Sequence, residues 1–285
     1  MAKKRGDNLD GIFDIFLWVG IVTLLIGYLF KYHFHKFRMI GFSLLGIFWA
    51  GEAPYYIHID DYFNAGLVLI TLPLFFYFAY NEYLSKKWDE DPEVMKFLAG
   101  GISIASLIYF GVQRIPAISG FLIKIVAEQT TWMTDLMGYS FDAGAIEYAG
   151  NPLFYRVNNE TIYVPIKGSG IHIILACTAL QTLAAAGALL YVTTAEKIVK
   201  IKSMLLVLPT VYIANIFRNA MVIYLTNEGI ASFDLAHNEI AKTGSVILLI
   251  VLLLLVFEMM PQFHENIMSV ITLYKREPIH QKQQK

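Results

Sequence analysis

The stretch Gly170-Ile-His-Ile-Ile-Leu-Ala-Cys-Thr-Ala-Leu-Gln181 decides the fold class and contains a candidate reactive residue. It opens an apolar segment that continues to about Val192, close to the ~20 residues of a membrane-crossing helix. It also holds the only cysteine of the chain, Cys177, together with the polar residues Thr178 and Gln181. Such a cysteine either packs as a small apolar side chain or acts as a nucleophile with partners elsewhere in the chain.

The composition of the whole chain is that of a membrane protein. Hydrophobic residues form 56% of the 285 residues and charged residues only 16%, whereas soluble domains carry about 25% charged residues. The net charge of −1 gives no basis for nucleic-acid binding. A single cysteine excludes an internal disulfide. We expect no metal ion and no cofactor.

Seven apolar segments reach or approach the length that crosses a bilayer. We therefore expect an all-α integral membrane protein with about seven transmembrane helices. Glu52 and Pro54 interrupt the second segment. The first is longer than a signal-peptide core and no cleavage site follows it, so we expect a retained span. The segments are Ile12–Phe30, Met39–Ile57, Tyr62–Tyr80, Met95–Gln113, Gly170–Val192, Ser203–Leu225 and Ala241–Met260.

The charges of the loops predict the orientation. Basic residues gather in 31–38, 86–87, 197–202 and the tail from Lys275, while the intervening turns are acidic or neutral. Basic loops face the cytoplasm, so seven spans place the N-terminus outside and the C-terminus inside. The basic run Lys3-Lys4-Arg5 opposes this orientation, and Asp7 and Asp10 offset it in part.

The only long connection, Arg114 to Ser169, is predicted to be a small extracytoplasmic insertion. Its first half, 115–136, is apolar with Lys124 and Glu128 one helical turn apart, which indicates an interfacial helix, with an eighth span as the alternative. Its second half is predicted to be a hairpin, with strands 153–157 and 161–164 around 158–160. The expected organisation is helices 1–4 in 1–113, the insertion in 114–169, catalytic helices in 170–262 and a cytoplasmic tail in 263–285.

This topology brings three reactive side chains to one layer beneath the outer surface. Cys177 lies seven residues into the inward-running fifth span, which is ~10 Å deep at a helical rise of about 1.5 Å per residue. Arg218 lies seven residues before the end of the outward-running sixth span, and His237 lies in the outer turn that follows. An arginine within an apolar span faces a polar partner or a wet cavity. Asn215 lies one turn from it and Asn219 beside it.

These residues suit acyl transfer. A thiolate is the nucleophilic form of cysteine, and a nearby cation favours it. His237 can accept the thiol proton and return it to the leaving amine, and Arg218 can stabilise the oxyanion of a tetrahedral intermediate. The product is a thioester on Cys177, with Thr178, Gln181, Asn215, Asn219 and Asn238 as the surrounding polar residues.

At these positions the chain resembles the exosortase/archaeosortase family, and its archaeosortase A branch most closely. The matching pieces are Ala176-Cys-Thr-Ala-Leu-Gln181, Asn215-Ile-Phe-Arg-Asn219 and Ala236-His-Asn-Glu-Ile-Ala-Lys-Thr-Gly244. The order Cys, Arg, His in successive helices is the family pattern, and family members vary the third residue. The specific resemblance covers about 156–255, and over the first four spans it is one of hydrophobic profile only.

The resemblance implies a membrane transpeptidase of archaeal cell surfaces. Its partners would be secreted proteins that end in a Pro-Gly-Phe motif, a hydrophobic helix and a basic end. A membrane lipid would be the acyl acceptor, and the site would lie near the extracytoplasmic face. Two alternatives stay open: an intramembrane cysteine protease without lipid transfer, and a seven-span transporter or receptor in which Arg218 and Glu52 line a polar pathway.

The topology yields the first prediction. In a Cys177→Ala background, a cysteine at Asn158 should react with a membrane-impermeant maleimide on intact cells, because the insertion is expected outside. A cysteine at Lys200 should react only after the membrane is opened. The reverse labelling pattern would place Cys177 near the cytoplasm and exclude a role on exported proteins.

Overall fold

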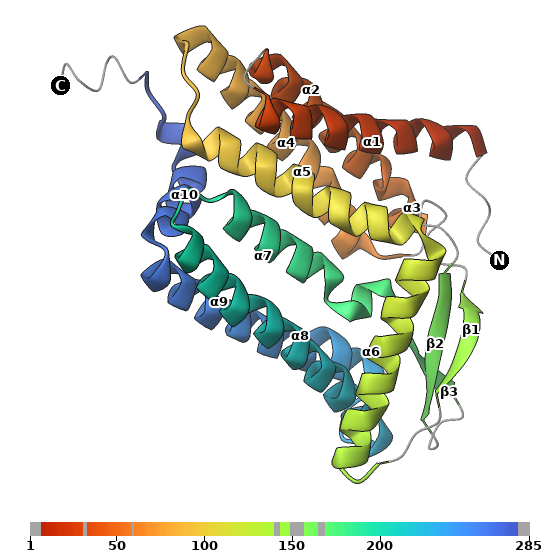
Figure 1. Cartoon of the computed structure of the whole chain (residues 1–285). Coiled ribbons are helices and arrows are strands. Elements are labelled where there is room, and N and C mark those ends of the chain that lie inside the picture. The colour runs from red at the N-terminus through yellow and green to blue at the C-terminus, as the bar shows by residue number, and fades with distance from the viewer. Residues whose placement is uncertain are drawn as a thin grey trace.

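The computed structural model describes residues 7–30, 33–58, 60–139, 143–148, 157–164 and 169–278. Over these residues the protein is a bundle of α-helices with one small sheet at its side (Figure 1). The helices are α1 (Asp7–Leu29), α2 (Phe34–Gly51), α3 (Ala53–His58), α4 (Tyr62–Trp88), α5 (Glu93–Arg114), α6 (Pro116–Leu136), α7 (Leu180–Val192), α8 (Lys197–Asn227), α9 (Ala241–Met259) and α10 (Pro261–Ile271).

The expected class, a helical membrane protein, is confirmed. Within the described residues, five helical segments are long and apolar enough to cross a membrane: 12–29, 62–88, 93–114, 197–227 and 235–259. Two of the seven expected spans fall short of this criterion. Helix α2 is 18 residues long and carries three charged or titratable side chains near its start, and α7 has only 13 residues. The predicted interruption at Glu52 and Pro54 is present, because α2 ends at Gly51 and α3 begins at Ala53.

The expected span over Gly170–Val192 is wrong in its first half. Strand β3 (Ser169–Ile173) is followed by a 3₁₀ turn at Leu175–Thr178, and helix α7 starts only at Leu180. Ala179 has φ +59°, in the left-handed region, which separates the 3₁₀ turn from the α-helix. Cys177 therefore lies on an irregular segment before a helix and not inside one.

The insertion consists of α6 and an antiparallel sheet of order β1-β2-β3, from β1 (Ala143–Tyr148), β2 (Val157–Val164) and β3. In Figure 1, α6 runs across the ends of α7 and α8 beside the sheet. Lys124 and Glu128, one turn apart on α6, form an ion pair at 3.9 Å. Helix α6 is not among the segments that meet the spanning criterion.

The predicted hairpin is wrong. The expected turn, 158–160, lies inside β2, where Asn158 pairs with Glu147 and Glu160 with Ala145. The strand continues through these polar residues because β1 and β3 satisfy its backbone on both edges. Residues 153–156 of the expected first strand lie outside the described residues.

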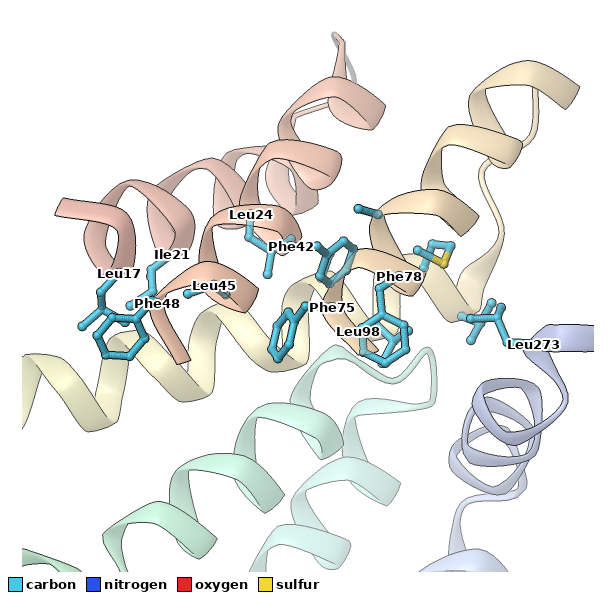
Figure 2. Close-up of a cluster of buried hydrophobic side chains, with 14 of the residues drawn as sticks. Leu17, Ile21, Leu24, Phe42, Leu45, Phe48, Phe75, Phe78, Leu98 and Leu273 are labelled. Carbon is cyan, nitrogen blue, oxygen red and sulfur yellow. The ribbon is translucent and has the colours of Figure 1, made fainter. Parts of the chain in front are cut away.

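One apolar cluster holds the N-terminal helices together (Figure 2). Side chains of α1, α2, α4 and α5 interdigitate, with Ile21, Leu24 and Phe42 fully buried. Helices α1 and α2 approach closely at Gly41, where an added Cβ would lie 2.8 Å from the Leu24 backbone nitrogen. Small residues allow such contact between helices in a membrane.

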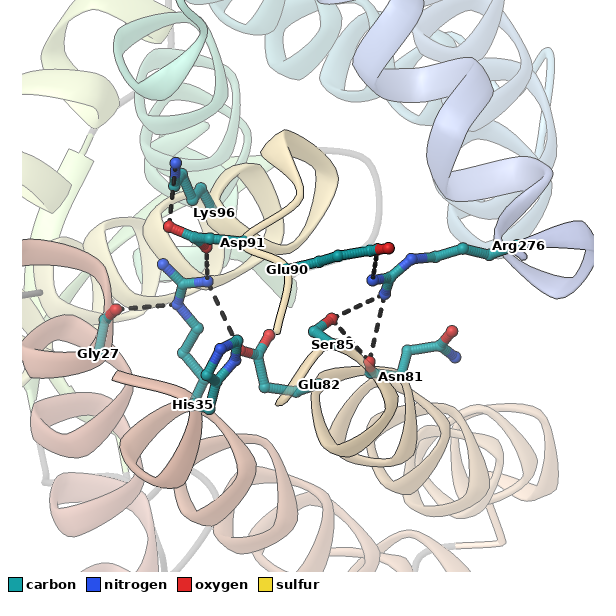
Figure 3. Close-up of polar contacts among 10 residues, drawn as sticks. Gly27, His35, Asn81, Glu82, Ser85, Glu90, Asp91, Lys96 and Arg276 are labelled. Atoms are coloured by element: carbon teal, nitrogen blue, oxygen red, sulfur yellow. Dashed lines mark hydrogen bonds and ion pairs between the residues drawn. The ribbon is translucent and has the colours of Figure 1, made fainter. Parts of the chain in front are cut away.

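A buried polar cluster closes one end of this bundle (Figure 3). Arg38 donates to the Gly27 carbonyl and to the Asp91 carboxylate, both at 2.8 Å. His35 Nδ1 lies 2.5 Å from the fully buried Glu82 carboxylate.

Arg276 belongs to the segment expected as a tail, but α10 and a 3₁₀ turn at Leu273–Lys275 fold it back onto α4. Its guanidinium reaches Ser85 Oγ at 2.7 Å and Glu90 Oε2 at 3.1 Å.

The contacts of Arg276 predict a stability effect. Arg276→Ala leaves the buried Glu90 carboxylate without this cation, which should destabilise the protein by about 3 kcal/mol. The measurement is thermal unfolding of the purified protein in detergent. Lys275→Ala is the matched control, because it removes a neighbouring cation that makes no ion pair with a described carboxylate. Equal unfolding temperatures for the two variants would contradict this role of Arg276.

Candidate active site

Cys177 lies where three parts of the fold meet. The 3₁₀ turn that carries it contacts α6, α7 and α8, and it follows directly from β3. The Cys177 N–H donates to the Ile174 carbonyl at 2.8 Å. The side chain is partly buried and packs against the apolar cluster of α6, α8 and β3. The local fold thus presents a thiol from a short turn between a strand and a helix.

Two asparagines of α8 hold the backbone of this turn. Asn215 Nδ2 donates to the Cys177 carbonyl at 2.7 Å, and Asn219 Nδ2 donates to the same oxygen at 3.1 Å. The two residues are four apart, so they lie on one face of the helix. A carbonyl outside regular structure needs such donors when it is buried. The pair fixes the position of Cys177 relative to α8.

Thr178 stabilises the same turn from the inside. Its hydroxyl donates to the Leu175 carbonyl at 2.7 Å and accepts from the Leu180 N–H at 3.4 Å. The second contact satisfies one of the free N–H groups at the start of α7, as an N-terminal cap does. Thr178 is buried, so its role here is to shape the backbone around Cys177.

Arg218 lies between the two asparagines on α8. It donates to Asn219 Oδ1 at 3.4 Å, and its charge acts on the Cys177 thiol. The three other arginines within the described residues, Arg38, Arg114 and Arg276, each pair with a carboxylate. Arg218 has no carboxylate partner in the described part of the chain, so its positive charge is left for another group.

His237 comes from a π-helical turn, Leu235–Ile240, that leads into α9. Such turns occur frequently at functional sites. The imidazole stacks on Phe233, with centroids 5.3 Å apart and planes 16° apart, and it lies in the field of Arg218. No hydrogen bond joins His237 to Cys177 among the described residues. Asn238 donates to the Asp234 carboxylate, and within the described residues it forms no hydrogen bond with the turn of Cys177.

Gln181 and Tyr109 flank the turn on the other side. Gln181 is exposed, and its side chain lies near the phenol of Tyr109 on α5. Tyr109 packs against the cluster that contains Cys177. The sequence does not indicate Tyr109, because an aromatic residue within an apolar span gives no signal of its own.

A cavity of about 320 Å³ lies between α7, α8 and α9, next to the Cys177 turn. Its polar lining is Gln181, Thr182, Asn215, Arg218, Lys242 and Ser245. A second cavity, of about 300 Å³, lies between α8 and α9, is lined mainly by apolar residues and also touches Arg218. Arg218 therefore lines both cavities.

The thiol needs a base. Cys177 lies outside the helices that are long enough to span a membrane, and its burial raises the pKa of the thiol above the ordinary value. A backbone hydrogen bond at Ile174 and the charge of Arg218 act in the opposite direction with smaller effect. The thiol is therefore protonated at neutral pH until a proton acceptor approaches.

The structure thus brings together Cys177, Thr178, Asn215, Arg218 and Asn219 through contacts. His237 lies on the neighbouring π-helical turn, where its described contact is the stack on Phe233. Among the described residues, no group of three or more His, Cys, Asp and Glu side chains could hold a metal ion.

Comparison with known proteins identifies the family. Residues 14–257 match the family described as transmembrane exosortase. The comparisons with curated proteins and with solved structures give no match. The matched region contains the Cys177 turn, Arg218 and His237, and it covers most of the chain. The chain belongs to the transmembrane exosortase family.

Proposed function

We propose that this protein is a membrane-embedded cysteine transpeptidase that cleaves the C-terminal sorting tail of secreted proteins and transfers the new C-terminus to a membrane lipid. The observation that carries the proposal is the double amide contact of Asn215 and Asn219 with the Cys177 carbonyl, with Arg218 between them. Through Asn219, this contact links the backbone of Cys177 to Arg218. Cys177 is the only cysteine of the chain, and Arg218 is the only described arginine without a carboxylate partner. Membership of the exosortase family supports the same activity.

In the first step, His237 accepts the proton of the Cys177 thiol as Sγ attacks the scissile carbonyl carbon. The carbonyl oxygen becomes an oxyanion, and the fixed charge of Arg218 stabilises it more strongly than it stabilises the neutral substrate. The C–N bond then breaks, and His237 returns the proton to the leaving amine. The thioester remains on Cys177. The imidazole stacks on Phe233 in the structure without bound substrate, and catalytic contacts of this kind tighten when substrate binds.

In the second step, a nucleophilic headgroup attacks the thioester carbonyl and releases the Cys177 thiol. The archaeosortase A type of tail, with Pro-Gly-Phe before the hydrophobic helix, is the substrate that we propose. A tail whose helix lies in the bilayer can approach α9 from the lipid, because little of the segment 235–259 is buried in the protein. We propose that the site faces the extracytoplasmic side, where exported tails are found.

The nucleophile can be tested directly. Cys177→Ala and Cys177→Ser should fold, since Asn215 and Asn219 hold the backbone carbonyl and not the side chain. Neither variant should cleave a reporter protein with a Pro-Gly-Phe tail, measured by its shift on a gel. A variant that cleaves at the parental rate would exclude the enzyme and favour a transporter or receptor. A parent that releases a free carboxyl terminus without attached lipid would favour the protease.

The shape of Arg218 gives a second prediction. Arg218→Lys keeps the charge but loses the planar, multidentate donor group, so kcat for tail cleavage should fall by about 100-fold. Expression and unfolding temperature should stay close to those of the parent. Arg276→Lys is the matched control, since it makes the same replacement at an arginine remote from the thiol. Full activity of Arg218→Lys would show that any cation at this position is sufficient and that the planar guanidinium is not required.

The charge of Arg218 gives a third prediction. Because this charge lowers the pKa of the Cys177 thiol, Arg218→Gln should raise that pKa further. The rate of Cys177 alkylation by iodoacetamide, followed against pH, should then rise at a higher pH than in the parent. Arg218→Lys should leave the profile close to the parental one. Superimposable profiles for Arg218→Gln and the parent would show that Arg218 does not act on the thiol.

A further inference from the structure

Two positive charges line the cavity between α7, α8 and α9. Arg218 enters it from α8 and Lys242 from the first turn of α9. Neither forms an ion pair with a carboxylate in the described part of the chain. Arg218 differs in this respect from the three other described arginines, Arg38, Arg114 and Arg276, each of which pairs with a carboxylate. The cavity therefore carries a charge that an anionic ligand can neutralise.

Apolar side chains form another part of the wall, beside the uncharged polar residues Gln181, Thr182, Asn215 and Ser245. Val211 comes from α8, and Val246, Leu248 and Leu249 come from α9. Val246 is 54% exposed, on a helix that has little of its surface buried in the protein. In Figure 1, α9 lies along α8 at the side of the bundle away from α1 and α2. An occupant can thus contact both the cations and the lipid that surrounds α9.

We infer that this cavity binds the phosphate-bearing headgroup of a membrane phospholipid, held by Lys242 and Arg218, and that this lipid is the acyl acceptor. A cation pair selects an anion, and the apolar wall selects a molecule that also has acyl chains. Inorganic phosphate meets only the first condition and diacylglycerol only the second. The inference rests on the proposed function and adds to it the class of the second substrate.

The transfer step follows from this placement. The thioester carbonyl carbon forms a bond to an amine nitrogen or hydroxyl oxygen of the headgroup, and its bond to Cys177 Sγ breaks. The proton of the headgroup nucleophile passes through His237 to the thiolate, which restores the thiol. Lys242 holds the phosphate throughout, while the five N–H donors of Arg218 serve both the phosphate and the oxyanion, and neither residue gains or loses a proton. The products are an amide or ester of the headgroup and the free enzyme.

The test measures binding without turnover. The full chain with Cys177→Ala, in maltoside detergent, is titrated with radiolabelled dihexanoylphosphatidylglycerol. Adding Lys242→Gln should raise Kd about tenfold, and Lys242→Glu should raise it further, through loss and then reversal of one charge at the phosphate. Lys242→Arg should bind within about threefold of its parent, which shows that the site still folds. Lys202→Gln, which removes a lysine from the other end of α8, should change nothing.

Competition experiments identify which part of the phospholipid the cavity recognises. Unlabelled phospholipid should displace the label, whereas inorganic phosphate and dihexanoylglycerol should each require at least about 100-fold higher concentration. Equal competition by inorganic phosphate, equal competition by dihexanoylglycerol, or unchanged Kd in Lys242→Glu would each overturn the inference. Tail cleavage by the parental enzyme is measured separately. A parent that cleaves the tail but does not bind the phospholipid would overturn this inference and leave the proposed cleavage activity intact. A parent that binds lipid but cleaves no tail would instead overturn the proposed function.

Discussion

The backbone carbonyl of Cys177 is the group on which the site depends. It belongs to an irregular turn between a strand and a helix, so no helical N–H satisfies it. Asn215 and Asn219 supply two amide donors at 2.7 and 3.1 Å instead. Within a membrane protein, non-helical backbone persists only where such partners or water satisfy it. This requirement explains why α8 carries two amides one turn apart and why Arg218, between them, is held beside the thiol.

The arginines of the buried polar cluster in Figure 3 have carboxylate partners, whereas Arg218 near the Cys177 turn has none among the described residues. In the cluster of Figure 3, Arg38 and Arg276 are matched by Asp91 and Glu90, so their charges are neutralised within the fold. Removing one partner there leaves a buried charge, which is a problem of stability. At the Cys177 turn, Arg218 has only an amide partner at 3.4 Å. A cation left unpaired in an apolar helix is retained for a ligand or an intermediate that carries negative charge.

The sequence predicted helices well and irregular backbone poorly. Long apolar runs and the pair of Glu52 and Pro54 predicted where helices lie and where one breaks, because these signals are local. The helix expected through Cys177 was wrong. The stretch 170–178 is as apolar as a span, but pairing with β2 makes 169–173 a strand, and 175–178 form a 3₁₀ turn. The polar face of Asn215, Arg218 and Asn219 followed from helical spacing alone. Tyr109 could not be predicted, because its place in the apolar cluster that includes Cys177 depends on how α5 packs.

Water is the competitor that this arrangement must exclude. A thioester that meets water is hydrolysed, and the protein would then act as a protease. Cys177 is partly buried in an apolar cluster, and the neighbouring cavity is bounded by α9, most of which faces lipid. In the proposed function, the bilayer itself completes the wall of the site, and the next nucleophile to arrive comes from the membrane. Exclusion of water by the surroundings also strengthens the action of Arg218 on a developing oxyanion, because the local dielectric constant is low. Exclusion of water from such a site favours transfer over hydrolysis, and for the same reason it favours formation of the thioester.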